Sequence, residues 1–277
     1  MKFSVLIAHY NNSVYFKDCF ESLKKQTYPN WEAIILDDGS KEEEKIAVKN
    51  IISGDVRFQY FENESNSGVG VTKAKLIELA IGEICGFVDP DDAILPTAIE
   101  KAINEFKQDS TLSLVYSRFL KCDSKLDIIE PFKHAKQVIN NDLYFFNFPV
   151  QIAHFVCFRK SIYLQTDKMN TQLKIAEDQD LYLKLYEKGN VKFINEINYL
   201  YRTHQNGISQ NENKKKSYEY WGEAIFNTMK RRGLSSINGR NIPQKFTNSE
   251  EIFELLKYQL GIRYRLIQKV KVFLQKI

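Results

Sequence analysis

Three carboxylates crowd the end of a short apolar segment in the first half of the chain. Residues 84–88 are apolar apart from one glycine, and Asp89, Asp91 and Asp92 follow directly. A short apolar run with turn residues at both ends is typical of a buried strand. Carboxylates this close repel one another unless a cation lies among them, and a hard divalent metal with oxygen ligands is the natural candidate. Taken alone, these residues fit a solvated acidic turn more simply.

A second group of acids opens a predicted helix in the second half of the chain. Glu177, Asp178 and Asp180 stand in its first turn, before Leu181 and Leu185, which have the spacing of a buried helical face. The helix dipole favours acids at this position. That effect explains one or two carboxylates more easily than three, so this group is a candidate site as well.

Composition restricts the class of protein. The chain has 277 residues, of which 43% are hydrophobic and 27% charged, as in ordinary globular proteins, and its formal charge of +4 is too small to imply nucleic acid as a partner. No stretch approaches the roughly 18 apolar residues of a membrane span, and the N-terminus runs directly into a predicted strand. The 4 cysteines are scattered without a CxxC pair, which predicts reduced thiols. We therefore expect a cytoplasmic protein.

Strand and helix patterns alternate over the N-terminal part of the chain. Apolar runs predict strands over residues 3–8, 31–36, 57–61 and 84–88, with helices between them. This alternation favours a doubly wound α/β fold with a mainly parallel sheet. Ligands bind such sheets beyond the carboxyl ends of the strands. Each polar cluster of this region falls at such an end, so several weak signals combine into one predicted site.

The first two strand-end loops carry side chains suited to a nucleotide. Tyr10 offers a ring that can stack on a base, and Asn11 offers an amide that can hydrogen-bond it. Asp37 and Asp38 can accept hydrogen bonds from a base or a ribose. The alternative is that the Asp-Gly-Ser sequence here serves only as a turn and helix cap.

The loop after the third strand leads to two lysines. Gly68 and Gly70 leave room for a ligand near the backbone, but the pattern lacks the third glycine of a GxGxxG dinucleotide site. Lys73 and Lys75 place cations where a diphosphate could lie. A solvated helix face is the competing interpretation of these lysines.

Taken in order, these motifs resemble those of the family 2 glycosyltransferases. The matching segments are residues 4–11, 26–28, 37–40, 66–68, 82–83 and 87–92. The resemblance is close over residues 3–97 and looser to about residue 209. Each motif alone is weak evidence, but their occurrence in this order is specific for the family. It implies the GT-A fold, a Rossmann-like mixed and mainly parallel sheet flanked by helices. It also implies transfer of a sugar from a nucleotide-sugar donor with inversion at the anomeric centre.

For the donor, the resemblance implies that Tyr10 stacks on the base, usually uracil. Asp38, with Asp37 beside it, would read the base, and Asp89 would face the ribose. The full donor-binding set that we expect is Ala8, Tyr10, Asn11, Asp37, Asp38, Asn66, Gly68, Lys73 and Asp89.

One departure from the family concerns the phosphates. Family members commonly carry Ala-Arg-Asn where this chain has Thr72, Lys73 and Ala74. Lys73 can meet a phosphate only as a point charge rather than as a fork. The contact that the asparagine usually makes is lost at Ala74, so donor affinity or identity can differ here.

For the metal, the resemblance assigns Asp89 and Asp91 to the DxD motif. Asp91 would bind a Mn²⁺ or Mg²⁺ ion that bridges the diphosphate and stabilises the charge of the leaving group. Asp92 would join the metal shell or orient its waters. His204 matches a family position close to the metal, where imidazole suits Mn²⁺ better than Mg²⁺; a surface histidine is the alternative.

For the catalytic base, the resemblance points to the acids at residues 177–180. We assign Asp178 as the carboxylate that deprotonates the acceptor hydroxyl, because an inverting single displacement needs a base opposite the leaving group. Asp180, on another face of the helix, is the reserve candidate. Glu177 would hold an acceptor hydroxyl.

The region between these motifs should contain the acceptor site. The aromatic run at residues 144–149 fits a sugar platform, although core packing is the more ordinary interpretation. His154 lies in a predicted strand over residues 152–159, where a core histidine is expected and a role on the acceptor side is the alternative. We expect residues 121–148 to be irregular and residues 205–209 to form a polar loop after a Tyr-rich strand.

The C-terminal segment differs in character. We expect residues 1–210 to form the glycosyltransferase domain, with a donor half (1–97) and an acceptor half (98–210), and residues 211–277 to form a helical extension. The last helix is predicted to begin at Ser249. After Glu254 there is no acid, and the cations there are Lys257, Arg263, Arg265, Lys269, Lys271 and Lys276. A basic amphipathic segment over residues 255–277 predicts contact with a membrane surface, or else packing on the catalytic domain or on a second subunit in a homodimer.

Together these features predict a cytoplasmic, metal-dependent inverting glycosyltransferase, which would lie at the inner face of the membrane if the C-terminal segment binds lipid rather than protein. Its donor would be a UDP-sugar, and its acceptor a saccharide or lipid-linked glycan in cell-surface polysaccharide synthesis, the last point following from the family alone. An inactive protein that binds nucleotide sugars or carbohydrates is the alternative, and the presence of both Asp91 and Asp178 argues against it. A nucleotidyltransferase would need an Arg- and Gly-rich loop near the N-terminus, which is absent.

Overall fold

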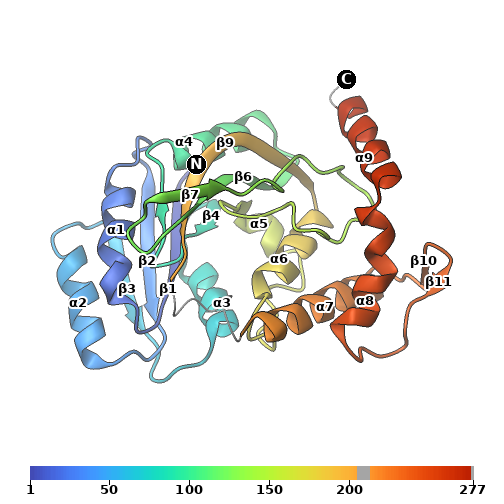
Figure 1. The fold of residues 1–277 in the computed structure, drawn as a ribbon. Helices are drawn as coiled ribbons and strands as arrows, with labels where there is room; N and C mark the ends of the chain where they lie inside the picture. The colour runs from blue at the N-terminus through green and yellow to red at the C-terminus, as the bar shows by residue number, and fades with distance from the viewer. Residues whose placement is uncertain (205–212, 276–277) are drawn as a thin grey trace.

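A computed structural model describes residues 1–204 and 213–275 of the chain. A twisted sheet forms its centre, and helices cover both faces (Figure 1). The strands are β1 (Phe3–His9), β2 (Trp31–Asp37), β3 (Phe58–Glu62), β4 (Ile84–Phe87), β5 (Ala93–Ile94), β6 (Leu112–Cys122), β7 (Ile128–Pro131), β8 (Cys157–Arg159), β9 (Asn190–Arg202), β10 (Ser236–Ile237) and β11 (Arg240–Asn241). The helices are α1 (Ser13–Lys24), α2 (Glu42–Ile52), α3 (Val69–Leu79), α4 (Ala98–Gln108), α5 (Lys160–Tyr163), α6 (Glu177–Tyr186), α7 (Asn213–Arg231), α8 (Ser249–Leu256) and α9 (Ile262–Leu274), with a 3₁₀ turn η1 (Lys257–Leu260).

The main sheet is mixed, and its N-terminal half is parallel. Its strands run in the order β3-β2-β1-β4-β8-β6-β9-β5, and β7 pairs with β6 as an additional edge. The pairs β3–β2, β2–β1, β1–β4 and β6–β9 are parallel, whereas β8 is antiparallel to both β4 and β6. This confirms the predicted α/β fold class, and it brings the carboxyl ends of β1, β2 and β4 to one edge.

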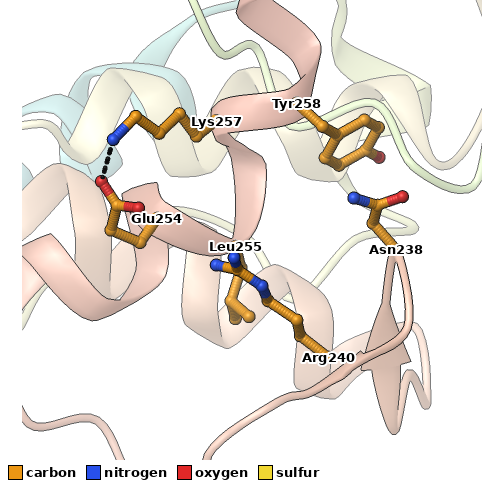
Figure 2. A pocket seen from close by; sticks show the side chains of 6 residues that line it. All are labelled: Asn238, Arg240, Glu254, Leu255, Lys257 and Tyr258. Carbon is orange, nitrogen blue, oxygen red and sulfur yellow. Dashed lines mark hydrogen bonds and ion pairs between the residues drawn. The ribbon is translucent and has the colours of Figure 1, made fainter.

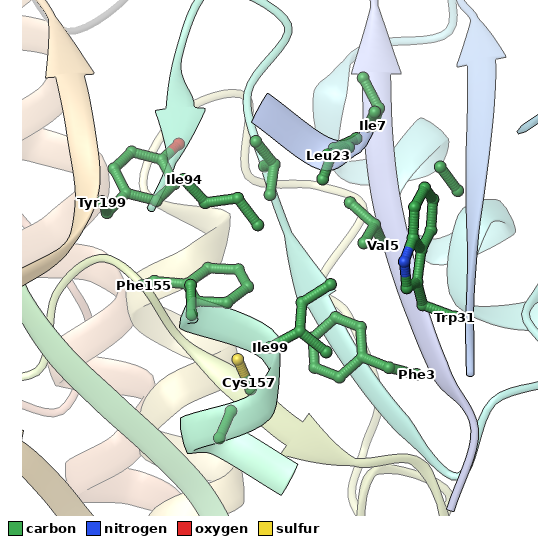
Figure 3. Packing of buried hydrophobic residues seen from close by; sticks show 14 of the residues in the cluster. Phe3, Val5, Ile7, Leu23, Trp31, Ile94, Ile99, Phe155, Cys157 and Tyr199 are labelled. Carbon is green, nitrogen blue, oxygen red and sulfur yellow. The ribbon is translucent and has the colours of Figure 1, made fainter. Parts of the chain in front are cut away.

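Two apolar layers hold the helices against the sheet. On one face, α1, α2 and α4 pack through side chains that include Phe16, Val48 and Ile99. Figure 3 shows part of this layer around Phe3 and Trp31. On the other face, α3 and α6 contribute Leu76 and Leu181, among others. The central strands are covered on both sides, which explains why their sequences are mostly apolar rather than alternating between apolar and polar residues.

Three elements differ from the sequence prediction. The strand expected over residues 152–159 begins only at Cys157, so His154 lies in the loop before β8. Residues 121–148, expected to be irregular, contain β7, which forms a hairpin with β6. The single last helix expected from Ser249 is broken at Gly261, whose backbone is extended (φ −68°, ψ 148°), so α9 is a separate helix.

The C-terminal helices build a third apolar cluster. It combines Ile225 and Met229 of α7 with Ile252 and Leu256 of α8, and Phe146 from the aromatic run closes it. The core interpretation of this run therefore holds for Phe146, which is fully buried. The helix α9 lies at the edge of the molecule, across the body from α1 and α2 (Figure 1). Among the described residues, no helix combines the length and apolar character needed to span a bilayer.

Candidate active site

The turn after β2 packs directly on the loop that leads into α3. Asp38 is buried, and its carboxylate accepts hydrogen bonds from the Asn63 side chain (2.8 Å) and from the backbone N–H groups of Ser67 (2.9 Å) and Gly68 (2.9 Å). Gly39 has a φ of 76°, and a Cβ atom there would lie 2.6 Å from the backbone nitrogen of Asn66. Only glycine permits this approach, so the two predicted donor loops form one rigid unit.

Asp37 links the ends of β1 and β2. Its carboxylate lies 2.8 Å from His9 Nδ1 and accepts a hydrogen bond from Ser40 N–H at 2.8 Å. Burial alone would raise the pKa of Asp37, but the hydrogen bonds from His9 and Ser40 outweigh it and lower this pKa to about 2. Asp37 is therefore an ionised carboxylate fixed in place, a structural support for the loops on either side.

The residues after β1 are arranged differently. The side chain of Tyr10 is 50% exposed, so its ring is accessible to a planar ligand. Asn11 adopts a positive φ of 47°, donates its backbone N–H to Ser40 Oγ (2.9 Å), and accepts from Lys41 N–H through its side chain (3.0 Å). Ala8 is partly buried at the end of β1, and Asn66 is exposed in the neighbouring loop.

The three-carboxylate turn between β4 and β5 is held by β9. Asp92 is buried and accepts hydrogen bonds from Tyr199 OH (2.6 Å) and Arg202 N–H (2.7 Å). Tyr199 OH also accepts from Asp89 N–H at 3.2 Å, and Arg202 Nε donates to the carbonyl of Asp91 at 2.6 Å. The sequence did not predict that Tyr199 and Arg202 hydrogen-bond this turn. The sequence of a Tyr-rich strand does not indicate which carboxylate its hydroxyl groups will contact.

Asp91 faces His204. The two side chains approach to 2.7 Å between Oδ2 and Nε2, and the other ring nitrogen, Nδ1, is buried without a hydrogen-bond partner among the described residues. Burial, with the charge of Asp89 added, raises the pKa of Asp91. Burial also raises the pKa of Asp92. The turn therefore places several carboxylates close together in a buried position, where the ionised form of each is unfavourable. A cation bound there would stabilise the ionised carboxylates.

The donor set fits a divalent ion shared with a substrate. Over residues 1–204 and 213–275, no three His, Cys, Asp or Glu side chains form a group able to hold a metal by themselves. Asp91 and His204 supply one carboxylate and one imidazole, a combination that suits Mn²⁺. The remaining ligands of such an ion would come from phosphate oxygens and water, as is usual where metals bind with phosphorylated substrates.

The acids at the start of α6 divide between two environments. Asp178 is partly exposed, and its carboxylate accepts only the N–H of its neighbour Gln179 (2.8 Å) among the hydrogen bonds of the described residues. Asp180 is buried and forms ion pairs with Lys184 (2.6 Å) and Arg231 (3.8 Å). The side chain of Asp178 is thus available to a ligand, and that of Asp180 is engaged in packing α6 against α7.

Lys73 connects the two groups of carboxylates. Its Nζ atom lies 2.6 Å from Glu177 Oε1, and both side chains are largely buried. Burial opposes the charge of Lys73, but Glu177, Asp89 and Asp178 together raise its pKa. Burial raises the pKa of Glu177 as well, against the effect of Lys73. One ammonium group therefore lies within electrostatic range of the donor turn and of the first turn of α6.

A surface pocket elsewhere is unrelated to these residues. It lies between the β10–β11 hairpin and α8, where Lys257 and Glu254 form an ion pair of 2.8 Å (Figure 2). Its lining residues are Asn238, Arg240, Glu254, Leu255, Lys257 and Tyr258. None of them belongs to the predicted site, whose residues come from the loops after β1, β2, β3, β4 and β9, from α3 and from the start of α6.

Comparisons with known proteins show the family and the fold of the chain. The model of the family described as "Glycosyl transferase family 2" matches residues 4–166. The chain is 29% identical over 201 residues to the chondroitin synthase of Escherichia coli, covering 71% of this chain but only 28% of that protein. Its fold is similar to the crystal structure of S. aureus TarS 1–349 in complex with UDP-GlcNAc (TM-score 0.70, 19% identity, 94% of this chain and 72% of that one). It is also similar to the mannosyltransferase PcManGT from Pyrobaculum calidifontis in complex with GDP-Man and Mn²⁺ (TM-score 0.59, 12% identity, 99% and 84%).

Proposed function

The chain belongs to glycosyl transferase family 2, and we propose that it is a metal-dependent inverting enzyme that uses a UDP-sugar. The observation that carries this proposal is the ion pair between Lys73 of α3 and Glu177 of α6, 2.6 Å long, which joins the helix after the donor loops to the helix turn that contains Asp178. A single displacement requires the leaving diphosphate and the base on opposite sides of one sugar. The ion pair joins the helix with the proposed phosphate contact to the helix with the proposed base.

The donor would bind along the loops after β1, β2 and β3. Tyr10 would stack on the base, while Asp38, Asn66 and Gly68 belong to the rigid pair of loops that would contact base and ribose. Ala8, Asn11 and Asp37 would shape the same surface, with Asp89 facing the ribose. The TarS complex with UDP-GlcNAc supports this class of donor through the shared fold.

Asp91 and His204 would hold the divalent ion, with Asp92 supporting Asp91 from the buried side. When bound, the ion supplies positive charge to the diphosphate as it leaves. Lys73 would add a second positive charge from α3. The Mn²⁺ in the PcManGT complex supports this assignment by analogy of fold.

Asp178 would act as the base. Its carboxylate would take the proton of the acceptor hydroxyl while the new bond to the anomeric carbon forms and the bond from that carbon to the diphosphate oxygen breaks. Glu177, held by Lys73, would orient the acceptor. The engagement of Asp180 by Lys184 and Arg231 favours Asp178 over the reserve candidate.

The acceptor would be a saccharide or a lipid-linked glycan in surface polysaccharide synthesis. The similarity to a chondroitin synthase supports a polysaccharide product, although this chain spans 28% of that protein. We propose that residues 211–277 are a helical extension of the catalytic domain, as the sequence predicts.

A donor screen tests the proposal. UDP-, GDP- and dTDP-sugars are incubated with the protein and Mn²⁺, and release of the nucleoside diphosphate is measured. We expect hydrolysis of at least one UDP-sugar that stops with EDTA and returns with Mn²⁺. Release of the nucleoside diphosphate that persists in EDTA would contradict the metal assignment. A preference for GDP- or dTDP-sugars would contradict the proposal that the donor is a UDP-sugar.

We further propose that α9 contacts an anionic membrane surface. Its side toward the protein carries Tyr264, Gln268 and Val272, which are partly buried, and Gln268 lies 3.5 Å from Asp142. The opposite side is apolar and exposed, with Ile262, Leu266, Ile267, Val270, Phe273 and Leu274. A helix that turns its apolar face away from its own protein is poorly explained by packing on that protein.

Charge favours lipid as the occupant of this face. Arg263, Arg265, Lys269 and Lys271 are exposed along α9, and residues 255–275 contain no acid. Cations that flank an apolar stripe are typical of helices that lie in the interface of anionic membranes. Lys276, the last cation of the predicted basic segment, lies outside the described residues, as does the predicted loop at 205–209.

Vesicle sedimentation tests this surface. We expect binding to phosphatidylglycerol-containing vesicles and much weaker binding to pure phosphatidylcholine. A double substitution, Leu266→Glu with Phe273→Glu, should weaken the binding at least about tenfold, because it removes buried apolar area and adds repulsion. The control is Val56→Glu, at a side chain that is 95% exposed outside α9. If the wild-type chain does not bind vesicles and instead forms a dimer that the double substitution dissociates, the apolar face of α9 is an interface with a second copy of the chain.

A further inference from the structure

His154 lies on an aromatic stack beside the candidate active site. Its ring is 4.8 Å from the ring of Tyr199 at an interplanar angle of 14°, and 5.5 Å from the ring of Tyr201 at 22°. Phe119 meets the same ring edge-on at 5.6 Å. The hydroxyl of Tyr199 holds Asp92, so the stack is attached directly to the three-carboxylate turn.

The backbone around His154 is fixed. The next residue, Phe155, donates its N–H to Ser117 Oγ at 3.2 Å and packs its ring on Tyr199 at 6.0 Å (Figure 3). Upstream, Asn147 is fully buried and accepts from the backbone of Ile152 at 2.8 Å. The Asn147 side chain also donates to Gln179 of α6 at 2.7 Å, so the loop and the helix that carries Asp178 are joined.

The surroundings of His154 include both halves of the site. Burial lowers the pKa of His154, while the carboxylates of Asp89 and Asp178 act to raise it and Lys73 to lower it. These three charged groups are the ones that would lie around the transferred sugar. A neutral imidazole has one nitrogen that donates and one that accepts, which suits a sugar hydroxyl.

No side chain or backbone group of residues 1–204 and 213–275 hydrogen-bonds the ring nitrogens of His154. His154 is only partly buried, and it forms no hydrogen bond or ion pair with any residue of the described part of the chain. A core histidine would be expected to satisfy its polar atoms within the protein. The ring of His154 packs on aromatic neighbours as a core residue does, but its nitrogens find no partner among the described residues, and a polar ligand beside the stack would supply one.

The reaction determines which part of the substrate meets this position. In an inverting displacement the anomeric carbon lies between the leaving diphosphate and the hydroxyl activated by the base. His154 stacks on Tyr199, which holds the three-carboxylate turn, and its loop is joined to α6 through Asn147 and Gln179. It is therefore placed to flank the sugar rather than the nucleotide. We propose that His154 hydrogen-bonds a hydroxyl group of the transferred sugar and discriminates among sugars on the same nucleotide. This inference rests on the proposed function.

Binding measurements that separate nucleotide from sugar test this role. Calorimetry in Mn²⁺ compares UDP with UDP-glucose, UDP-galactose, UDP-GlcNAc and UDP-glucuronic acid. His154→Phe keeps an aromatic ring on the stack but removes the hydrogen bond, and His154→Gln keeps polar atoms. The control is His134→Gln, at an exposed histidine that packs edge-on against Phe132 at 5.4 Å.

We expect His154→Phe to leave the Kd of UDP within about twofold of wild type and to weaken the best-bound UDP-sugar about three- to tenfold, the effect of one hydrogen bond. His154→Gln should recover part of the loss, and His134→Gln should change neither value. An equal loss for UDP and UDP-sugar would show a structural role, and no loss for either would show no role; both overturn the inference. Failure of the wild-type chain to bind any of these ligands would instead overturn the proposed donor class and, with it, this inference.

Discussion

The Nζ atom of Lys73 lies 2.6 Å from Oε1 of Glu177, so one ion pair joins α3 to α6 across 104 residues of sequence. Both side chains are largely buried, with exposures of 11% and 6%. Breaking a buried pair leaves one charge without compensation, which costs more than the pair itself contributes. The pair therefore ties the position of the proposed acceptor residues to the helix that carries the proposed phosphate contact.

Replacing Lys73 by Met should destabilise the fold and abolish transfer. We expect a loss of about 3–5 kcal/mol in the free energy of unfolding, because Glu177 remains buried and unpaired. Adding Glu177→Leu should recover much of the stability without recovering activity. Urea denaturation and donor hydrolysis measure the two effects. The control is Lys49→Met, which removes an exposed ion pair with Glu62 and should lower the free energy of unfolding by no more than about 1 kcal/mol. Equal losses of stability for Lys73→Met and Lys49→Met would contradict the prediction that burial makes the Lys73–Glu177 pair more important.

Asp178→Asn should lower mainly the rate of transfer, and Asp180→Asn mainly the stability of the fold. The first should lower the rate of transfer by about 10²–10⁴ with little change in stability, because Asp178 is partly exposed and unpaired among the described residues. The second should weaken a buried ion pair with Lys184 and lower the melting temperature while much of the rate is kept. Kinetics at a temperature where both variants are folded decide the matter. Near-normal transfer by Asp178→Asn together with loss in Asp180→Asn would reverse our assignment of the base.

Substitution of Asp91 or His204 should weaken Mn²⁺ binding in the presence of UDP. We expect a loss of at least about tenfold in the apparent affinity for either Asp91→Asn or His204→Gln, since each is a proposed ligand. Electron paramagnetic resonance of free Mn²⁺ gives the affinity without reference to turnover. Asp123→Asn provides a comparison at an acid outside the turn. Unchanged Mn²⁺ affinity in both ligand variants would remove them from the metal site.

Asp37 should make the fold sensitive to acid. Its pKa is lowered from 3.8 to about 2, so its contribution is complete above pH 3.8 and is lost as the pH falls through about 2. The difference corresponds to about 2 kcal/mol. We therefore expect wild-type protein to lose about 2 kcal/mol more than Asp37→Asn between pH 5 and pH 2, measured by urea denaturation at each pH. Parallel losses in the two proteins would show that Asp37 is not the group responsible.

The N-terminal half of the fold was predictable because its elements have strong local patterns. The runs at β1, β2 and β4 are mostly apolar and almost entirely buried, and such strands, covered on both faces, belong to a parallel sheet. The loop residues at their carboxyl ends then follow from topology alone. The region before β8 was less predictable, since the apolar run there continues through a loop that is buried against other elements, and the pattern does not distinguish the two.

The sequence by itself determined the fold class, the family and the two groups of carboxylates, because each depends on spacing along the chain. The tertiary structure decided how those groups are held and which of their members are accessible. Tyr199 and Arg202 support the three-carboxylate turn from more than a hundred residues away, and Asp180 is engaged by Lys184 while Asp178 remains accessible. Burial, pairing and pKa depend on contacts between distant segments, and such contacts leave no local pattern in a single sequence.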